Sequence, residues 1–568
     1  MHVRNRKAWR RSKRTTAVTV AGLSTLGFVL VGSAGAAPQS PFSATDAGPA
    51  NPKAIGITYP NKLSPGLIET IAAQGSMKLE NGTPAVPYYG YSGTGPMVPA
   101  VGSTAETSPN EAQKTEPDKN TYLDVSGQHG ADPSYHYGRH FVYQGHEAGA
   151  GYLTRINLDA NVDHRVTLLA TQDSDGKALP TFDGSTWDPF AHRLLFTAEG
   201  SNGGGVWQST LDPVNGSTTV NNLQGILGKG GYEGIQNDSA GNVWIVEDAS
   251  GATPDPTNAP GAKVPNSFVY RFVPTDRADL TKGGRLQALQ VKDANGNPIV
   301  FNGTNALTAT IAALHTYGSS FKTSWVTIHD TATDGTTPYS ANELAKPKGA
   351  TPFKRPENGV FRPGTRFGEF FFTETGDTSA TSAADNDFGG YGGIFKLSQS
   401  SPTADSGRLS LFYKGDKAHT GLDNIQFLGE NELTAVEDAG DTLHTQRDAL
   451  DSGYTFDTRA SYANGRQPVR WLAEGRDASA TLDSGYSDAK ATGDQKAATF
   501  QNDGDNEITG VHVSDGDPGI GGILGAQAPH PFKDGWRVFF TQQHGDNVTW
   551  EVLPSTRNDS NHGHGSDR

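Results

Sequence analysis

The segment NVWIVEDASG, residues 242–251, sets the pattern of this sequence: an apolar strand ends in two acidic residues, and a turn with glycine follows. Related segments recur along the chain, each a short β-branched or aromatic strand that ends in an acidic or amide residue close to a glycine. They are HFVYQGHEAG (140–149), RLLFTAEGS (193–201), EFFFTETGD (369–377), ELTAVEDAGD (432–441) and RVFFTQQHGD (537–546). In most of them a second apolar strand follows, which indicates antiparallel pairs.

Repeated antiparallel units with long, variable insertions are typical of propeller blades rather than of a sandwich. We therefore predict an all-β fold, a β-propeller of about six blades with long loop insertions, and five or seven blades also fit the spacing. The 70 glycines and 33 prolines agree with this fold, because they supply turns between short strands.

The overall charge and the cysteine content limit the function classes. A formal net charge of −15 disfavours nucleic acid as a partner, because its phosphates would be repelled. The chain has no cysteine, so it has neither disulfides nor thiolate metal ligands. Any bound metal must then be held by oxygen or imidazole, which favours hard cations such as Ca²⁺.

The two ends of the chain differ from its middle in composition. Residues 1–36 combine a basic start, an uncharged stretch over 15–32 and small residues before position 37, so we predict a signal peptide. The Arg10-Arg11 pair leaves the twin-arginine and Sec routes both open. We expect a linker and irregular lead-in over 37–120, with one amphipathic piece (GLIETIAAQG), the propeller over 121–554 and a disordered tail over 555–568.

The repeated strand ends indicate where function lies. If each repeat is the same strand of its blade, the acidic ends from separate blades meet at one rim although they are far apart in the sequence. Carboxylates that crowd together repel one another unless a cation lies among them, so a bound metal explains the pattern. The plainer alternative is that these residues only cap turns.

Several local motifs add candidate residues. Glu233 lies between glycines in GGYEGI, which lets the backbone approach a ligand closely. The motif KRPENG holds Arg355 and Glu357 around a proline, and arginine suits bidentate recognition of phosphate. Asp423 precedes Asn424 in GLDNIQF, an oxygen-rich pair, and Glu507 lies in DNEITG.

The order of the motifs is similar to that of the PhoX-type alkaline phosphatase family over roughly residues 60–553. The motifs that carry the resemblance are Gly145-His146-Glu147, Thr197-Ala198-Glu199, Glu233-Gly234, Arg355-Pro356-Glu357, Asp423-Asn424, Glu507-Ile508-Thr509-Gly510 and Gln543-His544-Gly545. The Arg-Pro-Glu and Gln-His-Gly motifs are the most specific of these.

The resemblance implies an exported monoesterase on a six-bladed propeller with iron and calcium in its central channel. It implies that Glu233, Glu357 and Asp423 are metal ligands and that Arg355, as the catalytic residue, contacts the phosphate. Glu147 and Glu199 would be further ligands, for Ca²⁺. We also place Glu507 among the metal ligands, whereas His544 has no assigned role.

The sequence departs from the family at the strand end around Ala198. The family has a cysteine there that ligates iron, and Tyr232 stands where a histidine usually precedes the Glu-Gly motif. Alanine offers no thiolate, so the resemblance predicts Ca²⁺ and leaves Fe in doubt.

The predicted function is an exported, metal-dependent phosphatase that hydrolyses phosphate monoesters. One alternative is a non-catalytic calcium-binding propeller, and another is a Ca²⁺-dependent propeller esterase, lactonase or phytase-like hydrolase, which would not need Arg355 beside Glu357. We expect a small phosphate ester as substrate, no nucleic acid partner and no stable membrane span after cleavage of the signal. We also expect a monomer that is secreted or held in the cell envelope.

Overall fold

The computed structural model of the chain describes residues 40–45, 61–93, 113–200, 203–211, 218–252, 261–301, 307–447, 449–475, 507–543 and 547–555. The chain divides into two units, Met1–Ser40 and Pro41–Arg568, and all described strands and helices belong to the second. The predicted signal peptide, residues 556–568 of the predicted tail, and His544 lie outside the described residues.

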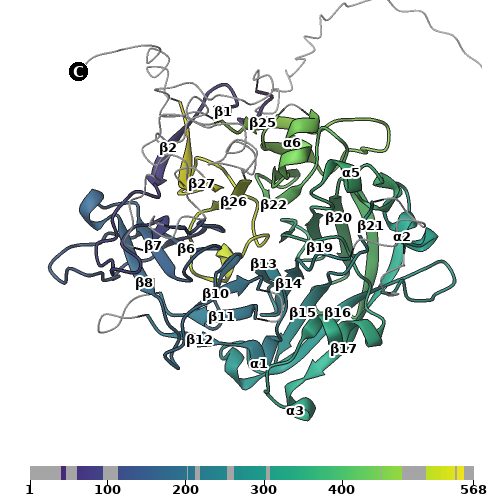
Figure 1. Cartoon of the computed structure of the whole chain (residues 1–568), viewed down its shortest axis with the longest axis horizontal. Coiled ribbons are helices and arrows are strands. Elements are labelled where there is room, and N and C mark those ends of the chain that lie inside the picture. The colour runs from purple at the N-terminus through teal and green to yellow at the C-terminus, as the bar shows by residue number, and fades with distance from the viewer. Residues whose placement is uncertain are drawn as a thin grey trace, which may run out of the picture. The chain divides into compact units, whose positions relative to one another are not determined.

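The strands of Pro41–Arg568 form antiparallel sheets around a common centre (Figure 1). Two of the four-stranded sheets come first in the chain. They consist of β5 (Thr121–Asp124), β6 (His140–Gly145), β7 (Leu153–Asn157) and β8 (Val166–Ala170), and of β9 (Ser185–Asp188), β10 (Arg193–Ala198), β11 (Gly205–Ser209) and β12 (Val220–Asn222).

The middle of the chain forms a nine-stranded sheet that contains two further blades. Its first blade is β13 (Tyr232–Asn237), β14 (Val243–Glu247), β15 (Val269–Pro274) and β16 (Gly284–Lys292), and its second is β18 (Gly359–Phe361), β19 (Glu369–Glu374), β20 (Gly393–Gln399) and β21 (Ser406–Lys414). An extra strand, β17 (Phe321–Asp330), pairs with β16 on one side and with β21 on the other, and so joins the two blades.

Two more blades complete the ring. They are β22 (Leu422–Phe427), β23 (Glu432–Glu437), β24 (Ser452–Asp457) and β25 (Val469–Ala473), and β26 (Glu507–Ser514), β27 (Arg537–Gln543) and β28 (Val548–Pro554). The first strands of the blades, β5, β9, β13, β18, β22 and β26, each contact the next, and β26 contacts β5. The ring of inner strands is therefore closed, and the predicted all-β propeller is confirmed.

The segment expected as an irregular lead-in contributes two strands to these blades. The amphipathic piece forms β2 (Leu67–Ala73), which pairs with β28, and β1 (Lys62–Leu63) pairs with β25. The strands of the propeller thus begin upstream of residue 121. An N-terminal strand that pairs with the last strand covers an edge that would otherwise expose unpaired backbone groups.

Short elements lie between the strands. They are β3 (Tyr91–Ser92), β4 (Gln113–Lys114), α1 (Gln224–Leu227), α2 (Ala309–Leu314), α3 (Thr331–Asp334), α4 (Ala341–Ala345), α5 (Ala380–Ala383), α6 (Asp441–Arg447) and the 3₁₀ turns η1 (Val162–His164), η2 (Leu280–Lys282), η3 (Lys346–Lys348), η4 (Asn386–Phe388) and η6 (Ile520–Gly522). Within the described residues, no helix is both long and apolar enough to cross a membrane.

The core lies between the faces of neighbouring sheets. Trp244 of the segment NVWIVED is 1% exposed, and its ring centroid lies 5.1 Å from that of Trp325 and 5.0 Å from that of Phe361. Edge-to-face contacts at these distances are favourable beyond the area that the rings bury. The apolar part of the repeat therefore packs blade against blade, which leaves the ends of the strands to meet at the centre.

Candidate metal centre

Each inner strand has one carboxylate at or just before its N-terminal end. Glu233, Asp423 and Glu507 lie at the start of β13, β22 and β26, whereas Asp118, Asp183 and Glu357 lie just before β5, β9 and β18. The ends of the second strands add Glu147, Glu199 and Asp248 after β6, β10 and β14.

These carboxylates converge. Four sets have ligand atoms that all lie within 4.8 Å of one another: Glu199, Glu233, Asp248 and Glu357; Asp118, Asp183 and Glu233; Asp118, Glu147 and Glu507; and Glu147, Asp183 and Glu199. Because the sets share members, they form one group, which we call the central cluster. Asp423 lies beside it, since its charge acts on Glu357 and Glu507.

Close backbone contacts bring the inner strands together. A Cβ on Gly184, which follows Asp183, would lie 1.9 Å from the carbonyl oxygen of Glu233. The N–H of Gly234 donates to the carbonyl of Glu357 at 2.8 Å. A Cβ on Gly234 would lie 2.7 Å from the Cα of Asn358. Glycine was expected beside Glu233 so that the backbone could approach a ligand. In the structure, the glycine permits the approach of the next inner strand.

The cluster is electrostatically unfavourable without a cation. Desolvation, and then repulsion from neighbouring carboxylates, raises the pKa of a set of these groups well above the ordinary value. The set is Glu147, Asp183, Glu199, Glu357, Asp423 and Glu507. In addition, Oε2 of Glu233 and Oδ1 of Asp248 are buried and accept no hydrogen bond within the described residues. Buried oxygens of this kind need a partner, and a divalent cation is one that satisfies several at once.

Arg355 lies against the cluster in a restrained conformation. Its φ is +52°, which is uncommon for a residue with a side chain, and the neighbouring Lys354 is anchored by an ion pair of 3.1 Å with Asp377. The Arg355 Nε donates to Oδ2 of Asp248 at 2.8 Å, and Nη2 lies 3.1 Å from Oε1 of Glu357. Desolvation alone would lower the pKa of Arg355, but the carboxylates around it raise it. The guanidinium is therefore charged and fixed beside the cluster.

The last residue of β14, β19 and β23 is a glutamate, and its environment differs from that of the central cluster. Glu247 accepts from Tyr270 Oη at 2.8 Å and from Asn342 Nδ2 at 3.1 Å. Glu374 lies 2.7 Å from His315 Nε2, and Glu437 accepts from Arg447 Nη1 at 2.8 Å. We call Glu247, Glu374 and Glu437 the backing glutamates. Their partners Asn342, His315 and Arg447 lie in or next to α4, α2 and α6, so the insertions hold the strand ends from behind.

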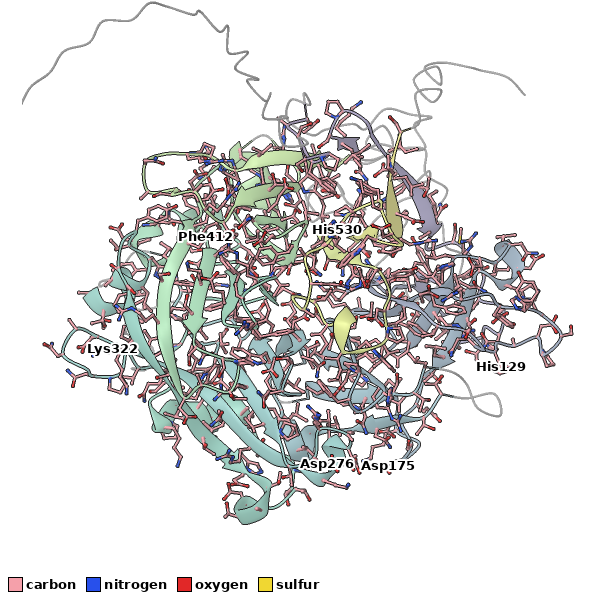
Figure 2. All side chains as sticks on the ribbon, turned by 180° about the vertical axis from the view of Figure 1, so that it is seen from behind. His129, Asp175, Asp276, Lys322, Phe412 and His530 are labelled. Carbon is pink, nitrogen blue, oxygen red and sulfur yellow. The ribbon has the colours of Figure 1, made fainter. Side chains whose placement is uncertain are left out.

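Not every acidic residue of the chain belongs to the centre. Asp175 and Asp276 lie at the outer edge of the propeller (Figure 2). Asp276 accepts from the N–H of Ala278 at 3.0 Å and pairs with Lys282 at 2.6 Å. The alternative of turn capping therefore applies to such peripheral residues, and not to the central cluster.

The donors of the cluster suit a hard cation. They are carboxylate oxygens throughout the four sets. His146, the residue before Glu147, is buried between Thr115 Oγ1 at 3.1 Å and Thr154 Oγ1 at 2.9 Å, so its ring is held by the fold. Ala198, where the family has its cysteine, is buried among apolar side chains. The residues present fit Ca²⁺ and do not fit a thiolate-ligated iron.

The structure brings the predicted site residues together. Glu147, Glu199, Glu233, Glu357 and Glu507 are members of the four sets, and Asp423 and Arg355 lie beside them. Their roles as ligands and as phosphate contact stay predictions. Gln543, of the Gln-His-Gly motif, donates to Glu147 at 2.8 Å.

Sequence reasoning missed Asp118, Asp183 and Asp248. The first two share a signal with Glu233, Glu357 and Asp423: an acid one to three residues from the start of an inner strand. Asp248 lies in the strand end NVWIVED, but the sequence pattern does not tell which of Glu247 and Asp248 faces the centre.

The comparisons with known proteins agree with the motifs. Residues 260–520 match the family model of alkaline phosphatase PhoX. The structure is similar to Pseudomonas fluorescens PhoX in complex with vanadate, a transition state analogue, with a TM-score of 0.52 and 11% identity over 90% of this chain and 98% of that one. At such low identity the similarity shows a shared fold.

More distant structural matches include TolB from Acinetobacter baumannii, with a TM-score of 0.28 and 8% identity over 72% of this chain and 61% of that one. Another is the catalytic domain of the Coprinopsis cinerea GH62 α-L-arabinofuranosidase, with a TM-score of 0.31 and 11% identity over 68% and 94%. Among curated protein sequences, none matches this chain significantly. The match of residues 260–520 to the model of alkaline phosphatase PhoX and the shared fold confirm the resemblance that the motifs indicated.

Proposed function

We propose that this protein is a metal-dependent phosphatase that hydrolyses small phosphate monoesters. The observation that carries the proposal is the position of Arg355 against converging carboxylates, in a chain whose residues 260–520 match the family model of alkaline phosphatase PhoX. Phosphoryl transfer needs clustered positive charge to offset the phosphate oxygens and a group that orients them. The cluster would supply the first part by holding divalent cations, and Arg355 would supply the second.

The residues of the chain would divide the work between them. Asp118, Asp183, Glu233, Asp248 and Glu357 would hold Ca²⁺ by carboxylate oxygens. When bound, divalent cations supply Lewis acidity and lower the pKa of water. Arg355 would orient the phosphate by its planar fork of N–H donors, which matches phosphate oxygens. Its φ of +52°, its hydrogen bond to Asp248 and its ion pair with Glu357 hold the guanidinium in place, so little conformational entropy is lost on binding.

A second function is favoured by one observation. Ala198 is buried among apolar side chains at the position where the family has a cysteine ligand, so one ligand of the family's centre is absent here. The remaining carboxylates could bind calcium without catalysis, and a non-catalytic calcium-binding propeller would contain the same cluster. A Ca²⁺-dependent esterase, lactonase or phytase-like hydrolase would also share the carboxylates. A binding propeller, an esterase or a lactonase would not need Arg355, because none of them has to orient a phosphate.

The test combines metal analysis with an assay. Elemental analysis of the purified protein should report calcium without stoichiometric iron. The protein should hydrolyse a chromogenic phosphomonoester, lose this activity on chelation and regain it with Ca²⁺. Arg355→Ala should lower kcat/KM by about 100-fold, because a fixed donor to developing charge is lost, and should leave the calcium content unchanged.

Arg362→Ala is the matched control, because Arg362 also pairs with a glutamate, Glu369 at 2.8 Å, at the end of β18 opposite to Glu357. This variant should keep wild-type activity. Calcium-loaded protein without turnover would support the binding propeller. Cleavage of a lactone or carboxylic ester that survives Arg355→Ala would support the esterase.

We also propose that the protein is exported and acts outside the cytoplasm. The support is the composition of residues 1–36. N-terminal sequencing of protein recovered outside the cytoplasm should then begin near residue 37, and a start at Met1 would contradict export with cleavage.

A further inference from the structure

Lys119 is a buried cation directly behind the central cluster. It follows Asp118, precedes β5 and is 1% exposed. Its Nζ donates to Oδ1 of Asn424 at 2.8 Å and to the carbonyl of Val511 at 3.2 Å. Both partners come from inner strands of other blades, β22 and β26, so one side chain ties three blades together at the centre.

The bond from Lys119 fixes which way the amide of Asn424 points. A lysine only donates, so the oxygen of the amide must face Nζ and its NH₂ group must face the other side. On that side Nδ2 donates to both carboxylate oxygens of Asp423, at 3.0 and 2.9 Å. Asp423 is thereby held by an amide whose orientation a second residue sets.

The same amide orients Asp118 through a hydroxyl. Nδ2 of Asn424 also donates to Oγ1 of Thr509 at 2.9 Å, and Thr509 donates to Oδ1 of Asp118. Because the hydroxyl has a single proton, accepting from Asn424 leaves that proton for Asp118. Asp118, Asn424, Thr509 and Asp423 are all at most 2% exposed, so water does not replace these bonds.

We propose that Lys119 is a positioning residue of the metal centre, which aims the carboxylates of Asp118 and Asp423 through Asn424 and Thr509. The proposal rests on the proposed function in that these carboxylates hold a cation. Outer partners of metal ligands commonly fix the orientation of the ligands, and their loss typically lowers metal affinity about 10–100-fold.

The charge of Lys119 makes the test sharp, because charge and positioning act in opposite directions. An ammonium group near a cation site repels the cation, so removing a lysine that acts only by its charge would strengthen Ca²⁺ binding. Removing a lysine that aims the ligands would weaken Ca²⁺ binding. The sign of the change therefore separates the two roles.

The experiment is calorimetric titration of chelator-treated full-length protein with CaCl₂, in the wild type, Lys119→Met, Asn424→Leu and the double variant. We expect each single variant to weaken Ca²⁺ binding about tenfold. The double variant should weaken it no further than the worse single variant, because both residues act through one hydrogen-bonded chain. If Lys119→Met does not fold, Thr509→Val tests the same chain with little change of shape.

Arg271→Met is the control for the loss of a buried cation. Arg271 is 1% exposed and donates to Gln287 and to the carbonyls of Pro402 and Ala404, on the outer side of its sheet. It should lower the melting temperature and leave the Ca²⁺ affinity unchanged.

Unchanged or stronger Ca²⁺ binding in Lys119→Met, or additive losses in the double variant, would overturn the proposal. No substrate enters the titration, so a wild type that binds Ca²⁺ but hydrolyses no phosphomonoester would refute the proposed activity alone. A wild type that binds no Ca²⁺ would refute both.

Discussion

Glu247 and Asp248 are neighbours at the end of one strand, both carry a carboxylate, and they have opposite environments. Glu247 points behind the strand and accepts from Tyr270 and Asn342. Asp248 points to the central cluster, where one oxygen pairs with Arg355 and the other accepts no hydrogen bond within the described residues. Successive side chains of a strand alternate between its two sides, so a change of one position exchanges a structural carboxylate for a candidate ligand.

The pair Glu437 and Asp438 repeats this division in another blade. Glu437 pairs with Arg447 at 2.8 Å, whereas Oδ2 of Asp438 lies 3.9 Å from Nη2 of Arg355. The acidic strand ends are therefore two populations. The backing glutamates connect the insertions to the blades, and in these two blades the next residue, Asp248 or Asp438, faces the centre.

The largest effect should come from a partner of a backing glutamate. Arg447 is held between Glu437 at 2.8 Å and Asp451 at 2.9 Å, and its side chain is 4% exposed. Arg447→Met leaves two buried carboxylates without their cation, so the free energy of unfolding should fall by about 3–5 kcal/mol. Urea unfolding of the chelator-treated protein measures the loss.

Arg459→Met is the matched control, because Arg459 also pairs with an aspartate, Asp457 at 2.9 Å, but its side chain is 68% exposed. Exposed pairs contribute little, so this variant should unfold close to the wild type. If the two variants were equally stable, the backing glutamates would not be structural.

The next effect concerns the residue that faces the centre. Asp248→Asn should weaken Ca²⁺ binding by about 100-fold, because a charged ligand is lost from the cluster. The same variant should lower the melting temperature of the calcium-free protein, since it removes the charge that pairs with the buried Arg355 at 2.8 Å. Calcium titration and thermal melts with and without Ca²⁺ give both numbers.

Glu247→Gln changes the adjacent carboxylate in the same way and serves as the control. Its Ca²⁺ affinity should stay close to the wild type, because Glu247 faces its hydrogen-bond donors and not the cluster. Equal losses of affinity in the two variants would show that the distinction between backing and centre-facing residues does not hold.

The sequence predicted the strands and their convergence, because both are local patterns. NVWIVED shows a strand by its β-branched and aromatic residues, and its repetition predicts blades. It did not predict β2 as a strand of the last blade. Leu67 pairs with Pro554, almost 500 residues away, and the residues around Leu67 do not indicate such a distant partner. Ring closure is decided by contacts between the two ends of the propeller.

The sequence predicted part of the candidate centre for the same reason. Glu147 and Glu199 follow repeated strand ends, and the resemblance supplied Glu233, Glu357 and Asp423. Where two acidic residues are adjacent, the exact end of the strand decides which of them faces the centre. A shift of one residue exchanges them, and a sequence pattern does not define the end of a strand so exactly. Lys119 was missed because a lysine close to acidic residues in the sequence is usually exposed to solvent, and only the fold shows that this one is buried.

The smallest effect is the pH dependence of the two populations. Desolvation and then neighbouring carboxylates raise the pKa of Glu199, Glu357 and Asp423, so the folded, calcium-free protein holds protons that the unfolded chain releases. The resulting stability is fully present below the ordinary carboxyl pKa of about 4 and is lost as the pH rises through the raised values. The melting temperature without calcium should therefore fall as the pH rises above about 4, by on the order of a few degrees.

Calcium competes with the same protons, so its stabilising effect should grow as the pH rises over this range. Thermal melts at several pH values, with and without Ca²⁺, measure the increment. Desolvation also raises the pKa of Glu247, to about 7, but Glu247 faces hydrogen-bond donors. Glu247→Gln should consequently change the pH dependence of the calcium-free protein and leave the calcium increment as it is, whereas Asp248→Asn should reduce the increment at every pH. An increment that stays constant or shrinks as the pH rises would mean that calcium binds somewhere other than among these carboxylates.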